Sequence, residues 1–272
     1  VMIACTWNKD LGYAFGNSIG RMANDMDVSG WYAPATNTHR SAFAGRNFEY
    51  YSEDGVLAGW MCANAVNGAR EWGVYSYVKH FATNDQETNR TNFLCTWLNE
   101  QSLREIYLKS FEITFKNSNP GATMVAFNNI GTIPAEACSE LLNTVLRGEW
   151  GFRGFAETDY FGGYGYQDAD RMIRNGCDLM LATYSTPQST VTDQTSATSV
   201  IAMRQASKNI LYTVVNSRAY DKEVSTGLPT WQKILYAIDV ILVLLLACLE
   251  FLVIKKYLAK KKELEPQVES TL

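Results

Sequence analysis

The segment Glu149-Trp-Gly-Phe-Arg-Gly-Phe-Ala-Glu-Thr-Asp-Tyr160 leads from an apolar helical pattern, through a Gly-Phe-Arg-Gly turn, into a short apolar strand at residues 155–158. The strand ends on Asp159, and a glycine-rich loop follows Tyr160. Parallel α/β folds carry their chemistry at the carboxyl ends of the strands, so Asp159 is a candidate catalytic group. Taken alone, the segment favours a simpler role, because an Asp at a strand end is often a turn former or helix cap.

Strand and helix patterns alternate on both sides of this segment, which predicts a parallel sheet covered by helices, an α/β fold. The predicted strands are residues 1–5, 28–33, 74–81, 123–127, 155–158 and 178–182. The predicted helices follow Asn8 and Thr132 and span residues 55–71, 99–116, 168–175 and 199–219. In the first helix the apolar residues at helical spacing are Leu11, Phe15, Ile19 and Met22, and in the last Ile201, Ala206, Ile210, Leu211 and Val214 are expected to face inward.

Polar residues come after four of the predicted strands: Arg46, the pair Lys79 and His80, Asn128, and Asp159. In a barrel these loops share one rim, so residues far apart in the sequence are expected to meet in one pocket. A doubly wound open sheet is the alternative, but no GxGxxG follows the first strand to support it.

Composition excludes several classes of function. The 272 residues carry a net charge of −4 with acidic and basic residues mixed, so no basic stripe predicts a nucleic-acid partner. The six cysteines form no CxxC pair and there are two histidines, His39 and His80, so no metal site and no cofactor are predicted. The 7 Trp, 15 Tyr and 12 Phe suit either sugar stacking or a core.

Residues 234–254 form an apolar run of 21 residues, long enough to cross a bilayer as a helix. Two acids interrupt it, Asp239 and Glu250, each about five residues from an end, where a charge costs less than at the centre. Five lysines occur in the fifteen residues after the run and two in the fifteen before it. The positive-inside rule therefore predicts a single-pass helix in membrane lipid, a cytoplasmic C-terminus and a strand–helix domain outside the cell.

Four segments resemble, in order and spacing, the motifs of glycoside hydrolase family 3. The segment Gly45-Arg-Asn-Phe-Glu-Tyr-Tyr-Ser-Glu-Asp54 is similar to GRNFExxSEDP, and Val78-Lys-His-Phe-Ala-Thr-Asn-Asp-Gln-Glu-Thr-Asn-Arg90 is similar to KHFxxNxQExxR. Leu103-Arg-Glu-Ile-Tyr-Leu108 matches the helix that comes next in the family. The segment from Leu146 to Asp159 resembles LRxEWGFxGxxxSDW, which carries the family's nucleophile. The resemblance covers residues 1 to about 220.

The resemblance implies a (β/α)₈ TIM-type barrel, of which about the last six units are present here. It also implies retaining hydrolysis of β-glycosides by a nucleophilic carboxylate and an acid/base. By match to the motifs, Asp159 is the nucleophile, and Arg46, Lys79, His80 and Arg90 bind the hydroxyls of the terminal sugar. Phe127 stands where the family often has Tyr, and Tyr160 replaces a Trp but can still stack on a sugar. These departures bear on the choice of substrate.

Two parts of a complete family member are expected to lie outside this chain. They are the first barrel units, with an Asp that binds the sugar, and the α/β-sandwich domain that supplies the acid/base. Because a membrane helix follows the barrel residues, the chain resembles the C-terminal part of a member with reversed domain order. The predicted organisation is a partial barrel at 1–225, a linker at 226–233, a transmembrane helix at 234–254 and a cytoplasmic tail at 255–272.

The leading hypothesis is a membrane-anchored, exo-acting β-glucosidase that takes terminal glucose from a β-linked glucoside or oligosaccharide. A β-xylosidase is the alternative within the family, because nothing in the sequence fixes the C6 group of the sugar. A non-catalytic carbohydrate-binding surface protein, and an unrelated membrane-tethered barrel, are the alternatives from other classes.

Overall fold

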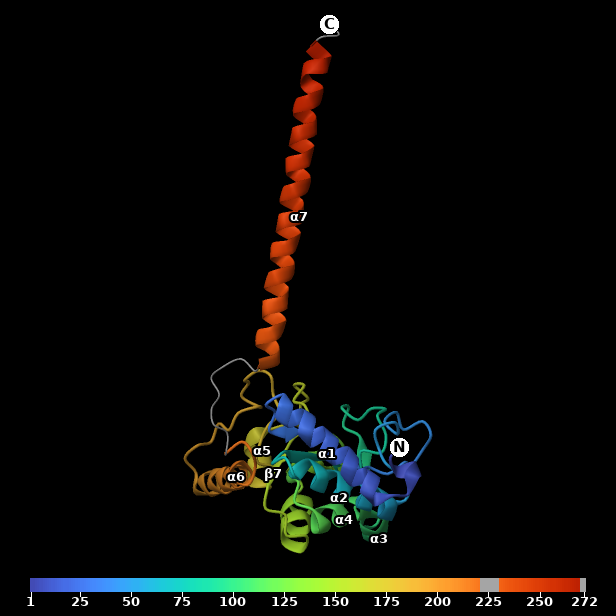
Figure 1. Ribbon diagram of the computed structural model, residues 1–272. Coiled ribbons are helices and arrows are strands. Elements are labelled where there is room, and N and C mark those ends of the chain that lie inside the picture. Colours follow the sequence, from blue (N-terminus) through green and yellow to red (C-terminus); the bar gives the residue numbers. More distant parts are fainter. Residues whose placement is uncertain (221–229, 270–272) are drawn as a thin grey trace. The chain divides into compact units, whose positions relative to one another are not determined.

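A computed structural model describes residues 1–220 and 230–269, with side chains up to residue 261 (Figure 1). The chain divides after residue 221 into two units, which are described separately. In chain order the elements are η1 (Ala4–Thr6), α1 (Lys9–Asp25), β1 (Gly30–Trp31), α2 (Gly55–Arg70), β2 (Tyr75–Phe81), β3 (Cys95–Thr96), α3 (Glu100–Ser102), η2 (Leu103–Tyr107), α4 (Lys109–Asn117), β4 (Gly121–Val125), β5 (Asn129–Ile130), β6 (Ile133–Pro134), η3 (Ala135–Ala137), η4 (Glu140–Glu149), β7 (Phe155–Glu157), α5 (Ala169–Arg174), α6 (Ala197–Val215) and α7 (Thr230–Glu269).

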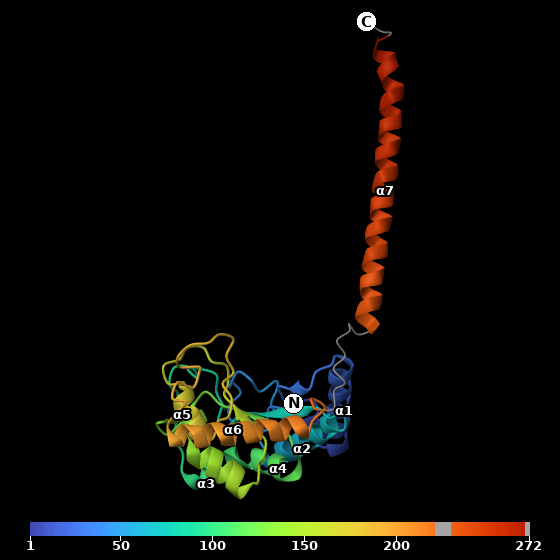
Figure 2. The same ribbon diagram turned by 90° about the vertical axis from the view of Figure 1, so that its left-hand side faces the viewer.

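A four-stranded parallel sheet in the order β1-β2-β4-β7 forms the centre of the first unit. Parallel neighbours need a crossover, and the helices between the strands provide it. A single parallel bridge from Glu157 to Leu179 continues the ladder past β7. Helix α6 packs against β4, β7 and α5 (Figure 2). The predicted parallel α/β arrangement is therefore observed, and the carboxyl ends of all four strands lie at one edge.

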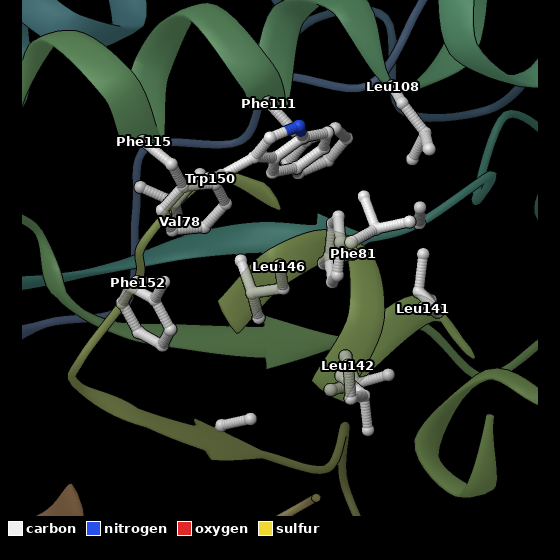
Figure 3. Close-up of a cluster of buried hydrophobic side chains, with 14 of the residues drawn as sticks. Val78, Phe81, Leu108, Phe111, Phe115, Leu141, Leu142, Leu146, Trp150 and Phe152 are labelled. Atoms are coloured by element: carbon white, nitrogen blue, oxygen red, sulfur yellow. The ribbon is translucent and has the colours of Figure 1, made fainter. Parts of the chain in front are cut away.

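The main core lies between one face of this sheet and the helices α4 and η4 (Figure 3). Phe81 of β2 is fully buried there, with ring centroids 5.3 Å from Phe111 and 5.8 Å from Trp150. Leu142 and Leu146 of η4 are also fully buried. A fully buried large side chain contributes roughly 1.5–3 kcal/mol, so this cluster holds β2 and β7 in place beneath the loops that follow them.

Helix α1 buries a glycine face and not its row of large apolar residues. Asn8 caps it by accepting the N–H of Asp10, as the sequence suggested. Its buried residues are Gly12, Gly16 and Gly20, which pack on α2, whereas Leu11 is 46% exposed and Met22 is 55% exposed. The helix was predicted correctly, but glycines let the two backbones approach closely, and this turns the large side chains outward.

Three other expectations about the elements are wrong. Residues 1–5 pair with no strand among the described residues, and Ala4–Thr6 form η1, whose turn is closed by the N–H of Trp7 donating to the carbonyl of Ala4. The helix expected from Thr132 starts later, because Ile133 and Pro134 pair with β5 in a small sheet. Residues 178–182 make one bridge instead of a strand, because the Asp178 carboxylate takes the N–H of Ala156 that a ladder would use.

Two residues that were expected to face inward from α6 are exposed in the first unit. Ala206 is buried as predicted, but Ile201 is 68% exposed and Leu211 is 59% exposed. The buried positions of α6 are mostly polar: Ser199, Asn209 and Thr213. Asn209 donates to the Asp178 carboxylate at 2.8 Å, and Thr213 bonds the carbonyl of Gly121, so hydrogen bonds to the sheet orient this helix.

The second unit is the helix α7. Within it, Thr230–Lys261 is long and apolar enough to cross a membrane, and its most apolar stretch of 18 residues has a mean hydropathy of 2.8. Most of the predicted linker, residues 226–229, lies outside the described residues, as does the very end of the predicted tail.

Candidate active site

Asp159 follows β7 directly, and its side chain is held at the edge of the sheet by backbone hydrogen bonds. The N–H of Thr158 donates to the carbonyl of Leu179 at 3.0 Å, which fixes the strand end. The N–H of Tyr160 donates to Asp159 Oδ1 at 2.7 Å, while Oδ2 accepts no hydrogen bond from the described residues. The residue is only 8% exposed. One carboxylate oxygen is therefore fixed, and the other is a buried acceptor without a hydrogen-bond partner among the described residues.

Two residues from a distant part of the chain face that second oxygen. Arg90 Nη1 lies 3.7 Å and His80 Nε2 lies 4.0 Å from Asp159 Oδ2. These distances exceed a hydrogen bond but are close enough for electrostatic attraction. Arg46 and Lys79 complete a set of three cations that act on the same carboxylate.

Burial raises the pKa of Asp159 above its usual value, and four interactions oppose this rise. They come from the N–H of Tyr160 and from the charges of Arg90, Arg46 and Lys79. The same cations, after burial itself, hold the pKa of His80 well below its usual value. His80 is therefore a neutral ring at pH 7, and it can either donate or accept a hydrogen bond at this position.

The cations are held in place by Glu49 and Glu87, two carboxylates that the sequence reasoning did not select. Glu49 pairs with Arg46 Nε and with Lys79 Nζ, the latter at 3.5 Å. Glu87 lies 2.9 Å from Arg90 Nε and 3.8 Å from Arg46 Nη1. The spacing in the sequence could have indicated both ion pairs, because Glu49 and Glu87 each stand three residues from the Arg that they bind. These pairs fix the directions of the long cationic side chains.

Asn37 and Tyr50 position His80. The Asn37 side chain donates to the carbonyl of His80 at 2.9 Å and accepts its N–H at 2.7 Å. The Tyr50 hydroxyl lies 3.5 Å from His80 Nδ1 and donates to the carbonyl of Asn84 at 3.1 Å. Asn37, Tyr50 and His80 are all buried. Asn37 and Tyr50, which belong to the loop at residues 35–53, therefore form part of the wall of the site.

The two predicted aromatic residues lie at different depths. Phe127 is 3% exposed, and its ring centroid is 4.8 Å from Cζ of Arg90, a cation–π contact. Tyr160 is 41% exposed, and its hydroxyl lies 3.1 Å from Oγ1 of Thr183. Phe127 therefore supports Arg90 from behind, and Tyr160 presents a ring at the rim. The structure brings the predicted residues Arg46, Lys79, His80, Arg90, Phe127, Asp159 and Tyr160 into one region.

Two further buried carboxyl groups lie near Asp159, and no pattern in the sequence indicates that either is buried. Glu136 of η3 is fully buried, and neither of its oxygens accepts a hydrogen bond from another described residue. Burial and then the charge of Asp159 raise its pKa well above the usual value. Burial raises the pKa of Glu157 to about 7; a hydrogen bond with Tyr32 opposes this rise, and the charge of Asp159 adds to it.

Asp85 provides a test of the electrostatics in the wall of the site. Burial raises its pKa to about 7, and the N–H of Thr38, 2.9 Å from Oδ1, and the charge of Arg40 oppose the rise. The folded state therefore binds this proton more tightly than the unfolded state. Its contribution to stability is present at low pH and is lost as the pH rises from about 4 to about 7.

We expect Asp85→Asn to remove this loss, because an amide can accept the Thr38 N–H without carrying a charge. Between pH 5 and pH 8 the free energy of unfolding of the wild type should fall relative to the variant by on the order of 3 kcal/mol. Urea unfolding of the full-length protein at the two pH values measures the difference. Other titrating groups are common to both proteins, and equal pH dependence in the two would contradict the assignment.

The observed geometry defines a class of site: a buried carboxylate at the end of a parallel strand, with one free oxygen and several fixed donors around it. Such an arrangement suits a small, oxygen-rich ligand such as a sugar and can supply a carboxylate nucleophile. In the described part of the chain, no group of three or more His, Cys, Asp or Glu side chains is arranged to hold a metal ion.

Residues 1–210 match the glycosyl hydrolase family 3 N terminal domain, and the chain therefore belongs to glycoside hydrolase family 3. It is 41% identical over 179 residues to beta-glucosidase A of Butyrivibrio fibrisolvens, a match that covers 65% of this chain and 21% of the relative. It is 39% identical over 178 residues to beta-glucosidase B of Emericella nidulans, covering 65% and 21%. The chain thus spans about a fifth of the length of these relatives.

Solved structures of the family have the same fold. Beta-glucosidase 3B of Thermotoga neapolitana in complex with glucose superimposes with a TM-score of 0.73 at 34% identity, covering 86% of this chain and 33% of that one. The Bifidobacterium adolescentis family 3 beta-glucosidase gives a TM-score of 0.74 at 27% identity, covering 83% and 33%. The likeness identifies the first unit as part of a TIM-barrel-like α/β domain.

Proposed function

We propose that the protein is a retaining β-glycoside hydrolase that removes terminal β-D-glucosyl residues, with Asp159 as the nucleophile. The observation that carries the proposal is the Asp159 carboxylate, buried and with one oxygen facing Arg90 and His80 across gaps of 3.7 and 4.0 Å. In this mechanism that oxygen attacks the anomeric carbon and forms a covalent glycosyl-enzyme, which water then hydrolyses. The acid/base comes from a domain outside this chain.

The surrounding residues have separate roles in this proposal. Arg46, Lys79, His80 and Arg90 donate hydrogen bonds to the sugar hydroxyls, and the Glu49 and Glu87 pairs keep the three cations oriented. Phe127 packs behind Arg90, and Tyr160 stacks at the rim. The named relatives are beta-glucosidases, and one solved neighbour holds glucose, which favours glucose over xylose as the terminal sugar.

We further propose that this chain forms the later units of an eight-unit barrel, about five because residues 1–5 are not a strand, and that other strands of the same protein complete it. Strand β1 has a partner on one side only, in the order β1-β2-β4-β7. Beside it, Trp7, Leu11, Met22 and Met26 of the α1 region are between 46% and 74% exposed. An open strand edge next to an exposed apolar helix face is the arrangement that additional βα units would cover.

Trapping with a 2-deoxy-2-fluoro-β-glucoside tests the proposed chemistry on the full-length protein. We expect the label on the peptide that contains Asp159, found by digestion and mass spectrometry. A label formed only by the xylose analogue would change the substrate to a β-xyloside and keep the mechanism. No label from either sugar, together with saturable glucose binding, would instead indicate a non-catalytic carbohydrate-binding protein.

Lys79→Met should reduce kcat/KM for aryl β-glucosides by about 10²-fold or more, since it removes a fixed donor and one of the cations acting on Asp159. Steady-state kinetics of the full-length protein measure the loss. Lys109→Met is the matched control, because Lys109 pairs with Glu112 on α4, away from the site, and this variant should keep its activity. Equal activity in the Lys79 variant would contradict a role in sugar binding.

We also propose that residues 234–254 anchor the protein in the cell membrane, with the barrel outside and residues 255–272 in the cytoplasm. Support comes from the hydropathy of α7 and from Lys255, Lys256, Lys260 and Lys261 after the apolar run. Deleting residues 234–272 should move the full-length protein from the membrane fraction to the soluble fraction. A truncated protein that still sediments with membranes, or a C-terminal tag that external protease removes from whole cells, would contradict this topology.

A further inference from the structure

Glu157 is the last residue of β7 and stands two residues before Asp159, and because the N–H of Thr158 still donates to the carbonyl of Leu179, the alternation of the strand continues and directs both side chains to the same face. Successive side chains of a strand alternate, so residues two apart lie on one face and roughly 7 Å apart along it. The contacts agree with this alternation. Phe155 lies against Tyr75 and Tyr77 of β2, with ring centroids 6.0 and 5.4 Å apart, whereas Ala156 belongs to the core on the opposite face.

The groups that face Glu157 are phenols and one carboxylate. They are Tyr32 after β1, Tyr77 in β2, whose ring centroid is 4.3 Å from that of Tyr32, and Asp159 at the end of the same strand. Cys177, in the segment before the Leu179 bridge, also interacts with it electrostatically. Glu157 is 5% exposed, and its Oε2 accepts no hydrogen bond from the described residues. Arg46, Lys79 and Arg90 instead act on Asp159.

We propose that Glu157 is a positioning residue coupled to the nucleophile, which holds a proton while Asp159 is ionised and releases it when Asp159 becomes a neutral ester. The ester step rests on the proposed function, but the coupling between the two carboxyl groups does not. Burial and the Asp159 charge raise the pKa of Glu157 and support this order of titration, while a hydrogen bond with the Tyr32 hydroxyl acts in the opposite direction without cancelling the rise. Two anions this close in a buried site are unfavourable, so the pair carries one proton near neutral pH.

In the proposed step an Asp159 oxygen forms a bond to the anomeric carbon, and the bond from that carbon to the leaving oxygen breaks. The bonding pair stays with the leaving oxygen, which takes a proton from the acid/base of the other domain. The three cations around Asp159 then lack its negative charge. The O–H bond of Glu157 breaks, its proton passes to solvent, and the new carboxylate restores a negative charge beneath the sugar.

Infrared difference spectroscopy on the full-length protein tests the coupling without requiring activity. The carbonyl stretch of a protonated carboxylic acid is distinct from the carboxylate bands, and Glu157→Gln should remove one such band at pH 6. In Asp159→Asn, the pH at which this band disappears should fall by about one unit, a tenfold change in the acid constant, because a neighbouring charge is gone. Glu140→Gln, an exposed carboxyl on η4, is the control and should leave the band intact.

An unchanged midpoint in Asp159→Asn, or no band lost in Glu157→Gln, would overturn the inference. Should Glu157→Gln fold poorly, Glu157→Asp keeps a carboxyl and should shift the band instead. Kinetics then separate this inference from the proposed function. The kcat/KM of the wild type should rise a further few fold above pH 7, and that of Glu157→Gln should not. An active enzyme with identical profiles for both overturns the role of Glu157 alone, and an inactive enzyme with a coupled band overturns the proposed function alone.

Discussion

Asp159→Asn in the full-length protein should lower kcat for aryl β-glucosides by roughly 10⁴- to 10⁶-fold, the scale on which removing a covalent nucleophile acts. The amide keeps the size of the side chain and can still accept the N–H of Tyr160, so the fold of the loop should not change. It cannot form a stable ester with the anomeric carbon. Steady-state and burst kinetics measure the loss, and the initial burst of aglycone should disappear.

Although Asp159→Asn should lose activity, it should not lose thermal stability. Burial raises the pKa of Asp159 in the folded state, so at neutral pH its ionised form opposes folding. Removing the charge should leave the melting temperature at pH 7 unchanged or higher. Asp54→Asn is the matched control, because Asp54 caps α2 by accepting the N–H of Val56 and Asn caps equally well. It should keep full activity.

Rescue by azide tests whether Asp159 is the nucleophile or only a residue that binds the sugar. In Asp159→Gly the missing side chain leaves space beside the anomeric carbon, and azide should restore turnover of activated aryl glucosides by giving the α-glycosyl azide. A variant of Asp159 that keeps wild-type kcat, or a rescued product of β configuration, would show that Asp159 is not the nucleophile.

Gly16→Ala should destabilise the protein by about 3 kcal/mol, because it separates two helices that are in backbone contact. A Cβ atom at Gly16 would lie 1.9 Å from the carbonyl oxygen of Ala65 in α2, and the obstacle is backbone, which cannot rotate away. The contact is equally close from the side of α2, since a Cβ at Gly68 would lie 2.1 Å from the carbonyl oxygen of Tyr13 in α1. Relief therefore requires the whole of α1 to move.

Gly12→Ala is the matched control on the same helix face. A Cβ there would lie 3.3 Å from the carbonyl oxygen of Met61, a contact that a shift of a few tenths of an ångström relieves. Because Ala favours a helix over Gly by about 1 kcal/mol, this change should be neutral or slightly stabilising. Thermal unfolding of the full-length protein measures both. Equal melting temperatures for the two variants would mean that α1 and α2 do not pack through their glycines.

The sequence was sufficient to predict the parallel α/β arrangement and the region of the site. Strands β2, β4 and β7 and helices α2 and α5 follow from local apolar patterns and caps, such as Asp168, which accepts the N–H of Arg171. Arg46, Lys79, His80 and Asp159 could be named because polar residues after parallel strands meet at one edge, whereas Arg90 was named only by its match to a family motif. The family motifs assigned roles to these positions.

Features that depend on residues far apart in the chain could not be predicted from the sequence. The inward face of α1 could not be predicted, because a glycine row becomes a packing surface only when small residues of α2 lie opposite. The segment at 178–182 has a strand pattern, but the bond from the N–H of Ala156 to Asp178, 22 residues apart, replaces the ladder.

The sequence by itself determined which polar residues follow the strands, because residue type and spacing are local properties, and its resemblance to the family motifs assigned the proposed chemistry to Asp159 and the cations. Only the tertiary structure decided the charge state of the site. Glu49 and Glu87 pair with the cations, and Glu136 and Glu157 become buried carboxyl groups beside Asp159. The physical reason is that desolvation and Coulomb interactions depend on distances across the folded chain, and no local pattern records them.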